Sequence, residues 1–267
     1  MQIEEAKMEE VLEILQKEAE NYINEASKCA YCSCNTEIQE LLSQDSLERF
    51  TAITKAIGFP LKDYDYEFSK LFGISDENED LARLMQSWIT LGSSVECALQ
   101  IFLAINLSNY KDSGWGSWEE FNFENVKGEL YKALNSIGEE NLPKKKRDSL
   151  KKIIKDFLKG KQETTHLEQL NLQSLIGFYK VNVWWIDEYT TELQIIRDYR
   201  NCVHSFKKRD IGEWDRLLDS LKFYCILLLD LRNMTPDVDD MLQLETELRA
   251  ECEMEFRADH DTYQNEY

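Results

Sequence analysis

One long amphipathic segment, residues 78–107, constrains the fold of this chain more than any other feature. Its apolar residues recur at steps of three and four, which is the spacing of one face of a helix. They are Leu81, Leu84, Met85, Trp88, Leu91, Val95, Leu99, Phe102 and either Ile105 or Leu107. A helix of about eight turns with a continuous apolar stripe is expected to be buried along its whole length. The stripe therefore favours a helical architecture.

The rest of the chain has the composition of a helical protein. Only 10 glycines and 3 prolines occur in 267 residues, while hydrophobic and charged residues make up 43% and 31%. This balance is typical of long amphipathic helices and not of short strands joined by turns. We therefore expect an all-α fold, with further helices near residues 3–27, 36–57, 123–137, 144–158, 171–204 and 210–233.

The sequence favours a cytoplasmic protein with no metal or cofactor. No apolar run reaches the roughly 18–20 residues that a bilayer span needs, and the acidic N-terminus is unlike a signal peptide. Seven cysteines, an odd number, fit free thiols in a reducing compartment. Cys29 and Cys32 have C-x-x-C spacing, but no second Cys or His pair follows at ligand spacing. A helical regulator that senses redox state or metal through Cys29–Cys34 stays a secondary hypothesis.

The formal net charge of −20 argues against a general nucleic-acid coat protein, because nonspecific binding to phosphate needs a positive field. Basic residues are nevertheless concentrated in residues 144–161. We interpret this segment as the solvated face of a helix whose apolar side is Leu150, Ile153, Ile154, Phe157 and Leu158. The alternative is a local cationic channel on an acidic body.

The most chemically informative stretch is IIRDYRNCVHSFKKR, residues 195–209. On a helix, Arg197, Arg200, Asn201 and His204 share one stripe. Imidazole exchanges protons near neutral pH, and guanidinium matches phosphate oxygens. The combination suggests a phosphodiester site. The structural alternative is a cationic cluster that is stabilised by the macrodipole at a helix C-terminus.

This stretch resembles the signature of the HEPN superfamily (higher eukaryotes and prokaryotes nucleotide-binding). The family motif is an arginine, usually followed by Asn, Asp or His, that is separated from a histidine by four to six intervening residues. Arg197, followed by Asp198, fits this pattern with six residues between it and His204. Arg200, followed by Asn201, has only three. The resemblance covers roughly residues 78–233 and implies an antiparallel helical bundle. Active members of the family are metal-independent ribonucleases that dimerise.

The resemblance implies a role for each motif residue. His204 would act as general acid or base in transesterification by the RNA 2′-hydroxyl. Arg197 or Arg200 would hold the scissile phosphate, and Asn201 or Asp198 would fix the imidazole or a phosphate oxygen. The basic residues that follow, Lys207, Lys208 and Arg209, are expected to bind substrate.

Glu96 is a supporting candidate on the flank of the long apolar stripe. A buried carboxylate needs a cationic partner, so Glu96 would orient the histidine or an arginine across the core. The alternative is an ordinary surface glutamate.

We expect three regions: an N-terminal helical extension (1–77), a HEPN-like bundle (78–235) and an acidic C-terminal helix or tail (236–267). The expected partners are substrate RNA, a second copy of the chain and a regulatory protein, with no membrane. By resemblance alone, the biological setting would be phage defence or a toxin–antitoxin pair. The alternative function is a noncatalytic HEPN-like scaffold that binds a nucleotide or a protein.

Overall fold

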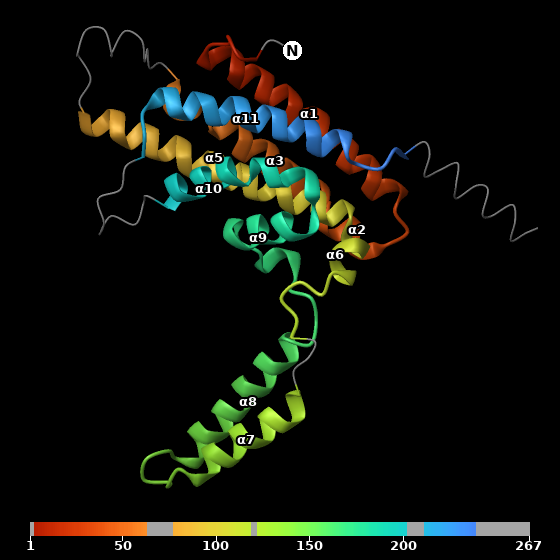
Figure 1. Cartoon of the computed structure of the whole chain (residues 1–267), viewed down its shortest axis with the longest axis vertical. Coiled ribbons are helices and arrows are strands. Elements are labelled where there is room, and N and C mark those ends of the chain that lie inside the picture. Colours follow the sequence, from red (N-terminus) through yellow and green to blue (C-terminus); the bar gives the residue numbers. More distant parts are fainter. Residues whose placement is uncertain (1–2, 63–76, 119–121, 202–210, 239–267) are drawn as a thin grey trace, which may run out of the picture. The chain divides into compact units, whose positions relative to one another are not determined.

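The computed structural model describes residues 3–62, 77–118, 122–201 and 211–238. Every regular element in these ranges is a helix, which confirms the expected all-α class (Figure 1). The chain forms two compact units, and the first joins residues 1–105 to residues 188–267. Residues 106–187 form the second unit.

The helices of the first unit range from one short 3-10 helix to the long helix α5. They are α1 Met8–Cys32, α2 Thr36–Leu41, α3 Gln44–Ala56, η1 Phe59–Leu61, α5 Glu77–Ile105, α10 Thr190–Arg200 and α11 Trp214–Asn233. The helices of the second unit are α6 Leu107–Asp112, α7 Phe123–Ser136, α8 Lys144–Gly160, η2 Leu167–Gln169 and α9 Leu172–Asn182. The 3-10 helix η3 Trp184–Tyr189 spans the boundary between the units.

Helix α5 is the central element of the first unit. It packs against α1, α3, α10 and α11, as its apolar stripe predicts. Trp88, Leu91, Val95 and Leu99 on this helix are fully buried. The predicted helix at 78–107 is therefore confirmed, with its end at Ile105. Burial along its whole length is not, because Leu81 near the start of the stripe is 48% exposed.

The first helix and the last helix of the bundle also pack together. Helices α1 and α11 lie side by side, although they are far apart in the sequence (Figure 1). This arrangement differs from the expected division, in which residues 1–77 form an extension to a bundle at 78–235. The reason is that the apolar stripe of α1, with Val11, Leu15 and Ala26 fully buried, covers α11 and α5.

A buried network of hydroxyl groups joins three helices of the bundle. Oγ of Ser94 on α5 lies 2.7 Å from Oγ1 of Thr54 on α3 and 2.8 Å from the hydroxyl oxygen of Tyr224 on α11. Nearby, the hydroxyl of Tyr22 on α1 donates to the carbonyl of Ala98 at 3.0 Å. Buried polar groups are costly without partners, so these bonds select one register of α5 against its neighbours.

Two of the expected helices are interrupted. The predicted helix at 36–57 divides into α2 and α3, because Ser43 has extended dihedral angles and its carbonyl accepts the first hydrogen bonds of α3. The predicted helix at 171–204 was also wrong as a single element, since α9 ends at Asn182 and α10 begins at Thr190. Here β-branched Val181 and Val183 flank Asn182, whose side-chain amide donates to the carbonyl of Phe178 at 3.0 Å. Residues of these types are weak helix formers, and asparagine competes for backbone partners.

The second unit contains a helical hairpin and a small aromatic cluster. Helices α7 and α8 pack against each other, as the sequence predicts (Figure 1). At the other end of the unit, Trp115 and Tyr110 contact Phe178 edge to face, with ring centroids 5.5 and 5.2 Å apart. The hydroxyl of Tyr110 donates to the carbonyl of Thr165 at 2.5 Å.

Among the described residues, one helix, Asn78–Ile105 within α5, is long and apolar enough to cross a membrane when judged by length and composition alone. Most of this segment is buried inside the protein, and the core helix of a globular protein passes the same test. The buried helix therefore gives little support for a membrane span.

We predict that replacing Leu15 with alanine destabilises the whole first unit. Leu15 is 0% exposed, so the lost contacts and the resulting cavity should cost about 2–5 kcal/mol in the free energy of unfolding. Urea denaturation followed by circular dichroism measures the loss. The matched control is Leu81→Ala on α5, which is 48% exposed and should change the free energy by less than about 0.5 kcal/mol. Equal effects of the two substitutions would contradict the packing of α1 into the core.

Candidate functional site

The candidate site lies at the C-terminal end of α10. Arg197 and Arg200 occupy the last turn of this helix, and Asn201 is its C-cap residue. The backbone N–H of Asn201 donates to the carbonyl of Arg197. Three predicted site residues therefore come together at one helix end. His204, Lys207, Lys208 and Arg209 lie outside the described residues.

Arg200 forms an ion pair across the bundle. Its Nη1 donates to Oε2 of Glu96 on α5, a residue 104 positions earlier in the chain. The side chains of Arg200 and Glu96 are 27% and 20% exposed, so the pair is mostly shielded from water. Shielding strengthens the attraction and makes the loss of either partner costly. The carboxylate that the sequence proposed as a partner for an arginine or the histidine thus contacts an arginine.

Gly92 makes room for this arginine. A Cβ at position 92 would lie only 2.7 Å from Cδ of Arg200 and 2.8 Å from its Cβ. Glycine in the interior of a helix costs about 1 kcal/mol relative to alanine. Gly92 was not predicted as a site residue, although an isolated glycine inside a helical pattern often has a packing reason.

Arg197 pairs with its own neighbour in the sequence. Its Nε and Nη2 lie 3.0 and 2.5 Å from Oδ1 of Asp198. The side chain of Arg197 is 22% exposed and that of Asp198 is 60% exposed. This pair is therefore more open to solvent than the pair of Arg200 with Glu96, and water and salt screen it more strongly.

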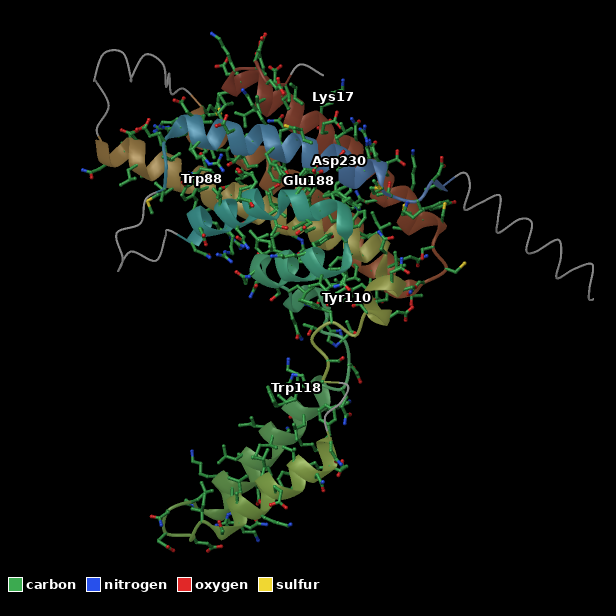
Figure 2. The ribbon with its side chains drawn as sticks, viewed as in Figure 1. Lys17, Trp88, Tyr110, Trp118, Glu188 and Asp230 are labelled. Atoms are coloured by element: carbon green, nitrogen blue, oxygen red, sulfur yellow. The ribbon has the colours of Figure 1, made fainter. Side chains whose placement is uncertain are left out.

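Aromatic and polar contacts hold the remaining faces of α10. The ring of Tyr199 packs on the buried ring of Trp88, with centroids 4.6 Å apart (Trp88 is labelled in Figure 2). On another face, Glu192 accepts hydrogen bonds from Arg216 and, at 2.6 Å, from Ser220, both on α11. Sequence periodicity does not predict these contacts, because the partners of Tyr199 and Glu192 lie on helices other than α10. Helix α10 is thus fixed against both α5 and α11.

A thiol lies beside the ion pair of Arg200 and Glu96. Cys97 follows Glu96 on α5, and burial raises the pKa of its thiol. The Glu96 carboxylate raises this pKa further, whereas the Arg200 and Arg49 guanidinium groups lower it. Cys97 is therefore a local reporter of the charges on the ion pair.

The cysteine-rich segment has a different environment from the loop that we expected. Cys29 and Cys32 belong to the last turns of α1. Of the segment Cys29–Cys34, only the last two residues, Ser33 and Cys34, lie beyond the end of this helix. Cys29 is buried, and burial raises the pKa of its thiol, with smaller contributions from Glu25 and Cys32. Within the described ranges, no three His, Cys, Asp or Glu side chains are grouped as a metal site would need.

The basic residues that the sequence singled out belong to both units of the chain. Residues 144–161 belong to the second unit, whereas Arg197 and Arg200 belong to the first. Within the described part of the site, each arginine is thus matched by one carboxylate, Asp198 or Glu96. The arrangement can bind an anion when the anion displaces or shares an arginine with its carboxylate partner.

Comparisons of this chain with protein-family models, with curated proteins and with solved structures found no match.

We predict that Glu96 and Arg200 control the titration of Cys97 in opposite directions. Glu96→Gln removes a charge that raises the pKa of Cys97, so alkylation should begin at lower pH. Arg200→Ala removes a charge that lowers this pKa, so alkylation should shift to higher pH. The measurement is the rate of iodoacetamide labelling of Cys97 against pH, read by peptide mass spectrometry.

The matched control is Glu79→Gln, which removes the carboxylate of another ion pair on α5, the one with Arg83. It should leave the titration of Cys97 unchanged. Shifts of the same sign in Glu96→Gln and Arg200→Ala would contradict the described pairing, because a change in access alone alters the rate and not the pH midpoint.

Proposed function

We propose that this protein is a metal-independent endoribonuclease of HEPN type. The single observation that carries the proposal is the half-buried ion pair between Arg200 and Glu96 at the end of α10. It fixes one arginine of the motif beside Asn201, three residues before His204. The all-helical bundle agrees with the architecture that the resemblance implies.

The ion pair supports phosphate binding by Arg200 because it positions the guanidinium in advance. A flexible arginine loses side-chain entropy when it binds, and this loss weakens binding. Arginine has five N–H donors, and the bond to Glu96 uses Nη1. The guanidinium therefore has the capacity to bind a phosphate oxygen while Glu96 holds it.

In the proposed reaction, RNA supplies its own nucleophile. His204 accepts the proton of the 2′-hydroxyl or donates a proton to the departing 5′-oxygen. Arg200 or Arg197 stabilises the extra negative charge on the phosphate, and Asn201 or Asp198 orients the imidazole or a phosphate oxygen. The products are a 2′,3′-cyclic phosphate end and a 5′-hydroxyl end. Lys207, Lys208 and Arg209 bind the flanking phosphates.

We further propose that the enzyme acts in the cytoplasm as a homodimer, under the control of a regulatory protein. The family resemblance suggests phage defence or a toxin–antitoxin pair. The net charge of −20 repels RNA from most of the surface, so productive binding depends on the local cations near the motif.

One observation favours a second candidate function, a noncatalytic scaffold that binds a nucleotide or a protein. Both arginines of the motif pair with carboxylates, Arg197 with Asp198 and Arg200 with Glu96. Such pairs hold a helix end in place without any chemistry. The two functions differ in one measurable result, since a scaffold cleaves no RNA.

We predict cleavage of transfer RNA or total RNA in the presence of EDTA. His204→Ala should reduce the cleavage rate by about 100-fold or more, because the proton-transfer group is lost. Arg200→Ala should reduce it by a similar factor if Arg200 stabilises the phosphate, and Arg197→Ala tests the other arginine. Analysis of the product ends for cyclic phosphate and 5′-hydroxyl identifies the reaction.

The matched control for the histidine is His166→Ala, since His166 is exposed in the second unit. This variant should cleave at the wild-type rate. Circular dichroism and thermal melting of each variant separate loss of activity from loss of fold. Intact RNA with the wild-type protein, at several salt concentrations, would reject the ribonuclease in favour of the scaffold.

A further inference from the structure

The hairpin of α7 and α8 exposes side chains that the sequence assigned to the apolar side of a helix. Of the residues on these two helices, only Leu158 is buried. On α8, Ile153 is 61% exposed and Phe157 is 53% exposed, and Leu150 is also exposed. Leu130 on α7 is exposed, and so is Ile137, the residue that follows this helix as its C-cap. The hairpin therefore has more apolar surface than its two helices cover.

The exposed residues of α8 follow one stripe. Leu150, Ile153 and Phe157 are three and four positions apart, which places them on one side of the helix. Ile154 and Leu158 lie on the adjoining side, where Tyr131 of α7 donates to the carbonyl of Lys151 at 3.1 Å. Helices α7 and α8 pack together. The side of α8 with Ile154 and Leu158 therefore faces α7, and the side with Leu150, Ile153 and Phe157 faces outward.

Leu130 of α7 lies on the same face of the hairpin as the exposed stripe of α8. By helical spacing, Leu130 is rotated from the packed side of α7 in the same sense as Leu150 and Ile153 from the packed side of α8. Because the connected helices run antiparallel, rotations in the same sense bring these residues to the same face. The result is one apolar face built from two helices.

Helix α8 of this hairpin is strongly basic, whereas α7 and the connecting residues 137–143 carry Lys127 and Lys132 against Glu124, Glu129, Glu139 and Glu140. Helix α8 contains eight Lys or Arg residues and two Asp residues, a surplus of six positive charges. The whole chain has a net charge of −20, so the remainder of the chain carries −26. Lysines are exposed on the polar side of α8, where Lys144, Lys145 and Lys152 line a shallow open groove.

An aromatic residue stands at the C-terminal end of α8. The backbone N–H of Trp118 donates to the carbonyl of Lys161 at 2.9 Å, and Figure 2 shows Trp118 at this end of the hairpin. Its ring contacts Phe157 edge to face at 5.7 Å, while Nζ of Lys161 lies 5.8 Å from the ring centroid. Tryptophan with a neighbouring lysine is the combination that favours the boundary between lipid headgroups and acyl chains.

We propose that this face of the α7–α8 hairpin binds the surface of an anionic lipid membrane. Leu150, Ile153 and Phe157 enter the boundary between headgroups and acyl chains, and the lysines of α8 contact the acidic headgroups. RNA would account for the lysines but not for the exposed apolar stripe. A second copy would account for the stripe, but it would bring two basic hairpins together. Only an anionic lipid surface complements both the charge and the apolar residues.

This inference is independent of the proposed ribonuclease activity. It departs from the expectation of no membrane partner, because that expectation rested on the lack of an apolar run long enough to span a bilayer and did not consider binding to the membrane surface. The cytoplasmic leaflet is the anionic one, so binding to it is compatible with a cytoplasmic protein.

Vesicle flotation with the full-length protein tests the proposal. The protein should float with vesicles of phosphatidylcholine and phosphatidylglycerol, and not with pure phosphatidylcholine. The variant I153S/F157S should weaken binding by about tenfold or more, because it removes apolar side chains without changing the charge. The variant K145E/K152E should weaken it by a similar factor, and the binding of the wild-type protein should fall as salt rises.

Two matched controls should float like the wild-type protein. V181S/I226S removes two exposed apolar side chains from α9 and α11, and K17E/K28E reverses two exposed charges on α1. Because all four substituted positions of the test variants are exposed, their circular dichroism spectra should match the wild type.

Four outcomes would overturn the proposal. No flotation with anionic vesicles rejects membrane binding directly. Flotation that is lost in K145E/K152E but kept in I153S/F157S indicates adsorption by charge alone, without entry of the apolar face. A dimer in sedimentation velocity that I153S/F157S dissociates, together with no flotation, assigns the face to a second copy. RNA binding that depends on Lys145 and Lys152, again without flotation, assigns the lysines to RNA.

Discussion

Burial of α5 is the interaction on which the rest of this structure depends. This helix contacts α1, α3, α10 and α11, and its side chains Trp88, Leu91 and Val95 are fully removed from water. Removal of apolar area from water is the main favourable term in folding. A helix covered on several sides also has little freedom to slide, because Ser94 must meet both Thr54 and Tyr224. The position of every group on α5, including Glu96, follows from this packing.

The candidate site depends on the fixed position of α5. Glu96 extends from this buried helix and pairs with Arg200. Gly92 permits the close approach of the Arg200 side chain, because a Cβ at this position would collide with it. A half-buried ion pair adds little net stability, because desolvation of both charges offsets their attraction. The ion pair instead holds the guanidinium of Arg200 in one orientation. This property suits a phosphate-binding site, and it equally suits a helix end that must stay docked.

The basic residues of the chain are concentrated in one element. Helix α8, in the second unit, carries a surplus of six positive charges, whereas the chain as a whole carries −20. One element of an acidic protein is therefore attractive to anions. The apolar face on the same hairpin adds a second kind of attraction, so one short segment combines two features that are dispersed elsewhere in the chain.

The sequence by itself determined the helical class and the positions of most helices, because apolar spacing reports helix faces directly. It also identified Arg197, Arg200 and Asn201 as neighbours on one helix end and Glu96 as a candidate partner, since these depend on local spacing and on the cost of burying a charge. Only the tertiary structure decided that α1 belongs to the bundle, that Gly92 accommodates Arg200 and that Ile153 and Phe157 remain exposed. The physical reason is that periodicity shows which residues share a face, whereas the neighbour that covers the face is chosen by packing between segments far apart in the chain.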